Sequence, residues 1–244
     1  MGTVITVTSG KGGTGKTSIT GAVAASLSLM DRTVLCIDMD IGLRNLDISL
    51  GLNDRALMDF SDVALGRCPL ARAVVPHPTL KGLSLLTSPM SLPASLTPEK
   101  IRALLDTARS MYDYILIDSP AGLGAGFRLA ICGADRAVVV ATNDASSLRD
   151  AQRTVSELDH MRQVHLVMNR IQTKLLRRLR ATIDDAMDAA GLPLIGVVPE
   201  DPYVILCANL GQPLTDRGKR GAALACWNIA RRLEGQRVPI MRIR

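Results

Sequence analysis

The sequence predicts an α/β protein with a doubly wound, mostly parallel sheet flanked by helices. Short apolar runs of strand length alternate with helical patterns along the 244 residues. Most of these runs are continuously apolar, which is typical of parallel strands covered on both faces. Strands that alternate with helices form such sheets. We expect one domain over residues 1–235, followed by a short basic tail over 236–244.

The strands expected along the chain are β-rich runs of four or five residues bounded by turn or helical segments. They lie at 4–7, 34–37, 83–86, 114–117, 137–140, 165–168 and 194–198. Apolar residues recur at helical spacing over 19–30, directly after the first run, and again over 223–233. In a doubly wound sheet ligands bind at the carboxyl ends of the strands. The loops that follow each run are therefore the places to search for chemistry.

Composition excludes several classes of protein. Apolar residues make up 47% and charged residues 21%, as in ordinary globular proteins. Aromatic residues make up only 2%, so the chain lacks the stacking residues of single-strand nucleic-acid readers. The longest apolar runs are too short to span a membrane. Five scattered cysteines indicate buried thiols in a reducing cytosol, and neither a disulfide framework nor a zinc site.

Positive charge is concentrated in the last third of the chain. Residues 1–160 carry 15 basic and 16 acidic side chains, whereas residues 161–244 carry 14 basic and 7 acidic ones. The second part therefore has a net charge of +7 (14 minus 7). This field favours an anionic surface, either lipid or nucleic acid. A solvated basic face is at least as good an explanation.

A phosphate-binding loop follows the first expected strand. Residues 9–18 read SGKGGTGKTS and match the pattern G-x-x-x-x-G-K-[ST] between a strand and a helix. We expect the backbone N–H groups of the loop to surround phosphate and Lys16 to place its charge between the β- and γ-phosphates. The Thr17 hydroxyl is expected to bind Mg²⁺. The predicted phosphate-binding residues are Gly10, Lys11, Gly12, Gly13, Thr14, Gly15, Lys16, Thr17 and Ser18.

Acidic residues follow two further strands. Asp38 and Asp40 end the second expected strand, and Asp118 ends the fourth. Alone, each would be interpreted as a helix cap. Three of them beside a phosphate loop favour binding of Mg²⁺ or positioning of a water molecule. We also expect Gly122 to bring its backbone N–H to the γ-phosphate.

The second lysine of the loop, Lys11, is not needed by an ordinary phosphate loop. The pattern Lys-Gly-Gly-x-Gly-Lys-Thr resembles the deviant Walker A motif of the MinD/ParA family of ATPases. Residues 38–47, 118–122 and 146–151 are similar to loops of the same family. The resemblance extends from Val4 to about Leu233.

The resemblance implies a P-loop NTPase fold and Mg²⁺-dependent hydrolysis of ATP to ADP and phosphate. It implies that Lys11 and Lys16 act in catalysis, with Lys11 reaching the nucleotide of a partner protomer. It implies that Asp40 positions the attacking water and that Asp38 and Asp118, with Thr17, serve the metal. The adenine pocket is expected at Asn169, Arg170, Pro199 and Asp201. Asn169 can read adenine through its amide, or it can be a turn residue that caps the next helix.

The resemblance also implies a function and partners. We expect an ATP-dependent homodimer that regulates division-site selection from the cytoplasm. Its expected partners are division regulators of the MinC and MinE kind, bound at the helix over 147–153. The alternative is a ParA-type partition ATPase, with Lys174, Arg177, Arg178 and Arg180 on nucleoid DNA; a solvated helix face is the simpler explanation of this cluster.

Two other members of the superfamily fit less well. An iron–sulfur ATPase needs cysteines paired across a dimer, and the chain has no C-x-x-C. A flagellar-number regulator is expected to carry an extension before the first strand.

The tail departs from the family pattern. The resemblance implies a C-terminal amphipathic helix that binds membrane, as is usual among the MinD-type members of the family, but here residues 236–244 read QRVPIMRIR. Pro239 interrupts any helix, and a helix this short is marginal in water. We expect the tail to pack on the domain, so that contact with the cytoplasmic face of the membrane is weak or absent.

Overall fold

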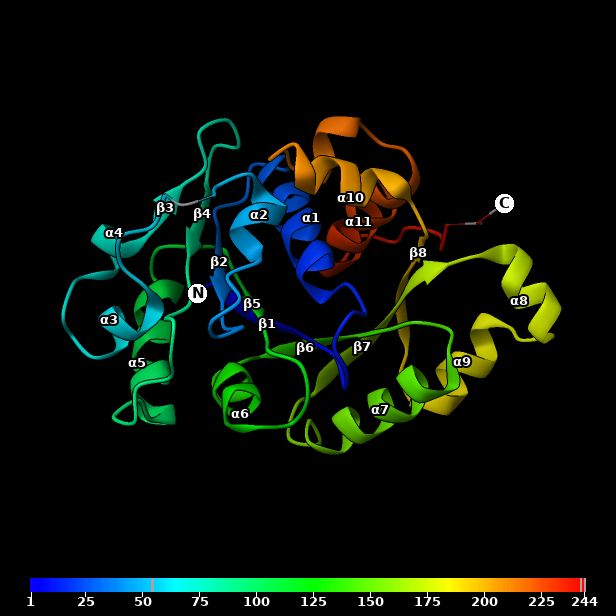
Figure 1. Cartoon of the computed structure of the whole chain (residues 1–244), viewed down its shortest axis with the longest axis horizontal. Coiled ribbons are helices and arrows are strands. Elements are labelled where there is room, and N and C mark those ends of the chain that lie inside the picture. Colours follow the sequence, from blue (N-terminus) through cyan, green and yellow to red (C-terminus); the bar gives the residue numbers. More distant parts are fainter. Residues whose placement is uncertain (54, 242, 244) are drawn as a thin grey trace.

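A computed structural model of the chain describes residues 1–53, 55–241 and 243. Within these residues, an eight-stranded sheet of order β3-β4-β2-β5-β1-β6-β7-β8 forms the centre of the molecule (Figure 1). Each pairing is parallel except that of β3 with β4. The strands are β1 Thr3–Thr8, β2 Val34–Asp38, β3 Val75–Pro76, β4 Leu83–Leu86, β5 Tyr114–Asp118, β6 Arg136–Ala141, β7 Gln163–Ile171 and β8 Leu194–Pro199.

The predicted fold class is confirmed, and each of the seven predicted runs is a strand. The edge strand β3 was not predicted. It has two residues, pairs antiparallel with β4 and ends at Pro76. So short a strand has no period that a sequence pattern could reveal, and proline is tolerated there because the strand lies at the edge.

Helices cover both faces of the sheet (Figure 1). One layer consists of α1 Lys16–Ser28, α2 Leu46–Leu50, α10 Pro202–Asn209, the 3₁₀ helix Leu214–Arg217 and α11 Gly221–Leu233. The opposite layer consists of α5 Pro98–Arg109, α6 Ala125–Ile131, α7 Ala145–Ser156 and α9 Ile183–Ala190. Three short helices lie toward the ends of the sheet, α3 Phe60–Ala64, α4 Leu70–Ala73 and α8 Thr173–Leu179.

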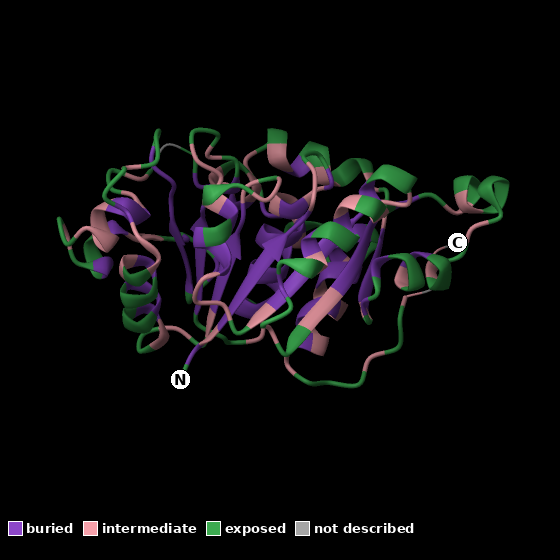
Figure 2. Cartoon of the chain, turned by 90° about the horizontal axis from the view of Figure 1, so that it is seen from below, coloured by how far each residue is buried: buried purple, intermediate pink, exposed green. Residues whose placement is uncertain are grey.

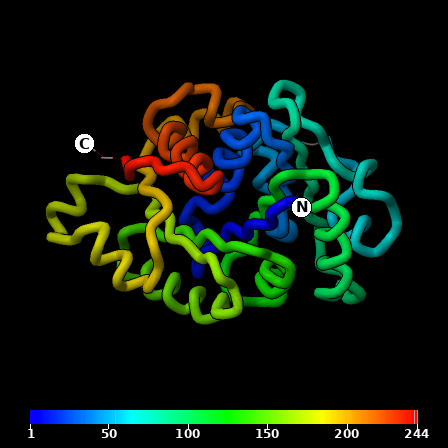
Figure 3. Tube along the Cα trace, turned by 180° about the vertical axis from the view of Figure 1, so that it is seen from behind, coloured from blue at the N-terminus to red at the C-terminus, as the bar shows by residue number. Residues whose placement is uncertain are grey.

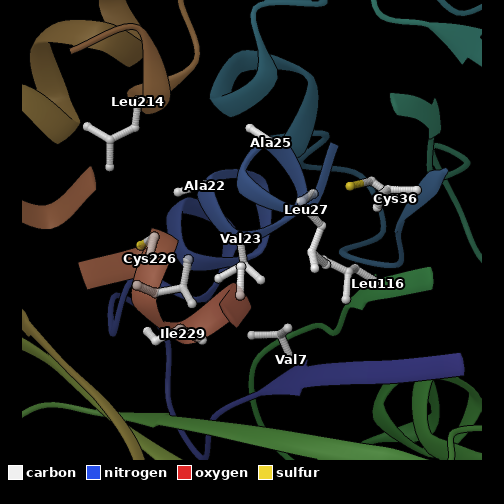
Figure 4. Close-up of a cluster of buried hydrophobic side chains, with 14 of the residues drawn as sticks. Val7, Ala22, Val23, Ala25, Leu27, Cys36, Leu116, Leu214, Cys226 and Ile229 are labelled. Carbon is white, nitrogen blue, oxygen red and sulfur yellow. The ribbon is translucent and has the colours of Figure 1, made fainter. Parts of the chain in front are cut away.

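The core lies between the sheet and these two layers. Figure 2 shows buried strands inside a shell of partly exposed helices. Successive residues of β1 point to opposite layers, so that Ile5 and Val7 pack with α1 while Val4 packs with the layer of α5. Figure 4 shows Val23 of α1 between Val7 of β1 and Ile229 of α11. Since α1 is covered by the sheet, α2 and α11, it is apolar on almost all sides.

The five cysteines are free thiols, as expected, but they are not all buried. Cys36, Cys207 and Cys226 are buried, whereas Cys68 and Cys132 are partly exposed. The expectation of buried thiols is wrong for those two, because both are only partly covered where they pack against the core between the sheet and α5. Within the described residues, no helix is both long and apolar enough to cross a membrane.

The C-terminal tail lies against the domain. The guanidinium of Arg232 in α11 donates hydrogen bonds to the carbonyl oxygens of Val238 at 3.0 Å, Pro239 at 2.6 Å and Ile195 of β8 at 2.8 Å. Met241 and Ile243 pack against the cores. The tail thus packs as the sequence suggested. Arg242 and Arg244, two of its basic residues, lie outside the described residues, and the division of the chain at residue 235 stays a prediction.

Candidate nucleotide and magnesium site

The loop between β1 and α1 requires glycine at several positions. Gly13 and Gly15 have φ values of 79° and 89°, a region that side chains disfavour. A β-carbon at Gly15 would lie 2.3 Å from Nδ2 of Asn169. One at Gly10 would lie 2.3 Å from the carbonyl oxygen of Asp150 in α7. The loop is therefore packed closely against both β7 and α7.

The first turn of α1 is open to an anion. Gly15 occupies the N-cap position without a side-chain capping bond, and the first turn holds no acidic residue. Its N–H groups therefore have no capping partner within the helix. Lys16, the first residue of α1, is only 6% exposed. A positive helix end and a buried ammonium together form the kind of site that binds phosphate.

Asp118 lies beside Thr17 at the end of β5. The Thr17 hydroxyl donates to Oδ2 of Asp118 at 2.7 Å, and the Thr20 hydroxyl donates to Oδ1 at 3.2 Å. Burial and the nearby charge of Asp38 together raise the pKa of Asp118 to about 7, against the lowering effects of the Thr17 and Thr20 hydroxyls and of Lys16. A buried carboxyl with its pKa raised in this way is better stabilised by a cation.

Asp38 is the register partner of Asp118 on the neighbouring strand. Its two carboxylate oxygens accept the backbone N–H groups of Asp40 at 2.9 Å and Leu46 at 3.2 Å. Burial raises its pKa to about 6 even though these two bonds lower it. In this structure Asp38 orders the loop after β2, and its role toward a metal stays a prediction.

These side chains fit a magnesium ion held together with a nucleotide. The donor set consists of oxygen atoms, which Mg²⁺ prefers, and the two buried carboxyls have raised pKa values that a nearby cation would lower. Among the described residues, no group of three or more acidic, histidine or cysteine side chains could hold a metal. Mg²⁺ bound to phosphates does not need one, since it uses one or two protein oxygens and several waters.

Asp40 and Gly122 belong to the loops that follow β2 and β5, near the phosphate loop. Burial raises the pKa of the Asp40 carboxyl, while the charge of Lys16 lowers it, so the two groups are electrostatic neighbours. Gly122 has a φ of 79°, and a β-carbon there would meet no atom within 4 Å. A β-carbon at Gly12 would lie 3.9 Å from that of Ala121. The two loops therefore approach each other, although the roles of Asp40 and Gly122 stay predictions.

Lys11 points to α7 within its own chain. Its ammonium lies 3.0 Å from Oδ1 of Asp144 and donates to the Ser146 hydroxyl at 2.7 Å. Partial burial alone would raise the pKa of Asp144, but the hydroxyls of Thr142 and Ser146, with Lys11, hold it well below its usual range. The predicted reach of Lys11 across a dimer is not tested by a single chain.

The residues predicted to hold adenine line a cavity of about 200 Å³. Asn169 is buried and donates from Nδ2 to the carbonyl oxygen of Thr14 at 2.8 Å. Arg170 lies 3.3 Å from Glu200 in an ion pair. Asp201 caps α10 and also accepts the N–H of Ala222 at 2.9 Å. Asn169 and Asp201 thus support the loop and helices here, and contact of any of these residues with adenine stays a prediction.

The apolar wall of this cavity was not predicted. Its residues come from α1, α10, the 3₁₀ helix and α11: Ile19, Val204, Ile205, Leu214, Ala222 and Cys226. Each looks like an ordinary core residue in the sequence. One signal was available in the sequence, because Ile205 and Leu206 are apolar neighbours shortly after the Pro199–Asp201 loop.

The chain is similar in sequence to known proteins over nearly its whole length. A family model described as "CobQ/CobB/MinD/ParA nucleotide binding domain" matches residues 5–222. The chain belongs to this family. Septum site-determining protein MinD of Synechocystis is 37% identical over 246 residues, which cover 99% of this chain and 92% of that protein. MinD of Bacillus subtilis is likewise 37% identical, over 98% of this chain and 92% of its own.

Solved structures of the MinD/ParA family agree with the fold. The chain resembles a MinC:MinD cell division protein complex of Aquifex aeolicus with a TM-score of 0.92 and 37% identity, covering 98% of both chains. It also resembles MinD of Pyrococcus horikoshii complexed with Mg-ADP, with a TM-score of 0.83 and 28% identity over 96% of both chains. A ParA family ATPase of Chlorobium tepidum, at 24% identity, shows the fold alone. The similarity therefore supports a MinD-like division-site ATPase more strongly than the ParA alternative.

Proposed function

We propose that this MinD-like ATPase hydrolyses ATP to ADP and phosphate with Mg²⁺, and that ATP drives it to form a homodimer. The observation that carries the proposal is the uncapped start of α1 beside the buried Lys16, with the Thr17–Asp118 hydrogen bond one residue further on. Three phosphate-directed features thus lie within one turn of helix. Within the described residues Lys16 has no carboxylate at ion-pair distance, and core packing alone does not account for burying such a lysine.

Each residue has a specific part in the proposed reaction. The backbone N–H groups of the loop bind the phosphates, and Lys16 offsets their charge. Asp40 orients the water that attacks the terminal phosphate. Thr17 and Asp118 would hold Mg²⁺, with Asp38 acting through the loop that it orders. The metal, when bound, supplies positive charge at the phosphate oxygens.

Lys11 can exchange its contact with Asp144 for a contact with a nucleotide at little energetic cost. Its ion pair with Asp144 is exposed, with side-chain exposures of 38% and 48%, so the pair contributes little to stability. Loss of the contact with α7 would free the ammonium for a nucleotide on a second protomer. We propose that this exchange accompanies dimerisation.

We propose a MinC-like division regulator as the partner, because a relative with 37% identity forms a MinC:MinD complex. A MinE-like partner rests on the sequence resemblance alone. The proposed partner surface is α7, whose outward residues Arg149 and Arg153 are exposed. Membrane contact is proposed to be weak, since the tail is held by Arg232. The ParA-type alternative would place DNA on α8, whose basic side chains are exposed.

The test is the mass of the protein in solution with ADP and with ATP, together with its rate of ATP hydrolysis. We expect a monomer with ADP and a dimer with ATP. Lys11→Ala should bind ATP but neither dimerise nor hydrolyse it, whereas Asp40→Ala should accumulate as an ATP-bound dimer. Lys174→Ala on α8 is the matched control and should behave as the unmodified protein. A Lys11→Ala protein that dimerises normally with ATP would refute the proposed exchange.

A further inference from the structure

A cavity of about 800 Å³ lies at the amino-terminal edge of the sheet, opposite to the phosphate loop. The first residues of β1, β5, β6, β7 and β8 line it, together with the end of α11. Figure 3 shows the end of α11, in red, beside the strands of this region. None of the residues predicted from the sequence to bind nucleotide or metal lines this cavity.

The charges of this amino-edge cavity do not balance. Its acidic residues are Asp113 and Glu234, and both are already engaged. Glu234 pairs with Arg32 at 2.6 Å, and Asp113 accepts the N–H and the hydroxyl of Thr33 at 2.8 and 2.9 Å. The arginines of the lining are Arg32, Arg136, Arg162 and Arg232. Two carboxylates therefore face four guanidinium groups.

Three of these guanidinium groups have no carboxylate partner among the described residues. Arg232 donates to three backbone carbonyls, and its burial lowers its pKa, as expected for a cation held without a counter-charge. Arg136 donates to the carbonyl oxygen of Leu233 at 3.2 Å. Arg162 is exposed, and no ion pair with it is found in the described part of the chain. The cavity therefore presents positive charge that an anion can neutralise.

His165 adds an unsatisfied polar atom to the same cavity. It is the third residue of β7, and its Nδ1 is buried without a hydrogen-bond partner in the described structure. Burial lowers its pKa, and the charge of Arg136 lowers it further, so the ring is neutral at pH 7. A buried polar atom without a partner is uncommon in a folded protein. A ligand with a hydrogen-bonding group would provide that partner.

We propose that this cavity binds a ligand carrying a phosphate group, held by the guanidinium groups of Arg136 and Arg162 beside the ring of His165. Several unpaired guanidinium groups suit a dianion, and their forked donors match phosphate oxygens. The volume is that of an ordinary small-molecule site. The phosphate can belong to a soluble metabolite or to a lipid headgroup, since both present the same chemistry.

The first test is an NMR titration of the histidine rings with inorganic phosphate. The chain has only three histidines, so the His165 signal can be assigned by substitution. Mg-ADP at saturation keeps the phosphate loop occupied. We expect a saturable change of the His165 signal, and a rise of about one pH unit in its titration midpoint, because a bound anion favours the charged ring. The signals of His77 and His160 should not change.

Substitutions separate this site from general electrostatic attraction. Arg162→Gln should weaken the effect of phosphate on His165 at least tenfold, and Arg136→Gln should do the same. Arg177→Gln on α8 removes the same charge from an exposed position away from the cavity, and it should have no effect. Each variant should bind ATP normally, which shows that it is folded.

A second arm identifies the source of the phosphate. The full chain is sedimented with vesicles of phosphatidylglycerol and, separately, of phosphatidylcholine. Pelleting with the former that Arg162→Gln abolishes and Arg177→Gln does not would support a headgroup. No pelleting, together with the His165 response to free phosphate, would support a soluble ligand. If neither His165 nor pelleting depends on Arg162, the proposal is wrong.

Discussion

The two edges of the sheet differ in how their polar side chains are hydrogen-bonded. At the carboxyl edge the polar side chains are tied to one another, as in Thr17 to Asp118 and Asn169 to the Thr14 carbonyl. At the amino edge, Arg162 and Nδ1 of His165 have no partner among the described residues. The carboxyl edge is thus preorganised by contiguous motifs, whereas the amino edge collects its charges from distant parts of the chain. A binding site can therefore be indicated by a contiguous sequence motif, as at the carboxyl edge, or by charged side chains without a partner, as at the amino edge.

The largest expected effect is a loss of ATP affinity from a substitution at the carboxyl edge, with no change at the amino edge. Lys16→Ala should weaken ATP binding at least 100-fold, since the phosphates lose their principal counter-charge in a buried position. Isothermal titration calorimetry with Mg-ATP measures this. Arg162→Gln, at the other edge, should leave the affinity within twofold. An affinity of Lys16→Ala close to that of the unmodified chain would contradict the assignment of the site.

A smaller effect is expected at Asn169. Removing its 2.8 Å hydrogen bond to the loop in Asn169→Ala should weaken nucleotide binding about tenfold, because a buried hydrogen bond is worth roughly 1–3 kcal/mol when one partner is left alone. Comparison of ATP with GTP separates two roles. Equal losses for both nucleotides would show that Asn169 supports the loop, whereas a loss confined to ATP would show that it reads adenine.

The tail allows a test of how the amino edge is built. Arg232 lines the cavity there and also holds the tail. A chain that ends at Gln236 should lose about 1–3 kcal/mol of unfolding free energy, through lost hydrogen bonds and apolar contacts. Urea unfolding measures the loss. Arg237→Gln, which keeps the tail, serves as the control, and unchanged stability after truncation would show that the tail does not hold to the domain.

The smallest expected effect is the pH dependence of stability that His77 contributes, which can be compared with that of His165. His77 is buried, its Nε2 donates to the Leu50 carbonyl at 2.9 Å, and its Nδ1 accepts the N–H of Leu80 at 3.0 Å. Burial lowers its pKa below 6.5, so its contribution to stability is present above pH 6.5 and is lost as the pH falls toward the folded pKa. We expect the free energy of unfolding to fall between pH 7 and pH 5, because the unfolded chain takes up a proton on His77 before the folded chain does.

Unfolding in urea at several pH values measures this slope, with His77→Gln as the comparison. The variant should be less stable at pH 7 and less sensitive to acid. The corresponding slope for His165 should change on addition of phosphate, and that for His77 should not. A His77→Gln protein with the same pH dependence as the unmodified chain would contradict the assignment.

Contiguous patterns made the fold and the phosphate loop predictable. Continuous apolar runs identified the parallel strands, and residues 9–18 carry their chemistry in order along the chain. The apolar wall of the nucleotide cavity and the amino-edge arginines were not predictable. The arginines lie as far apart in sequence as Arg32 and Arg232, and they are brought together by the pairing of β6 with β7 and by the packing of α11 against the sheet. The edge strand β3 escaped prediction for another reason, because its two residues are too few to form a pattern.

The contact of Gly10 with α7 has a mechanical consequence. Backbone meets backbone there, since a β-carbon at Gly10 would overlap the carbonyl of Asp150. Neither side has a flexible side chain that could absorb a displacement. The loop therefore cannot move toward α7 at this point unless the helix moves as well. The position of the outer surface of α7 therefore depends on the position of the phosphate loop.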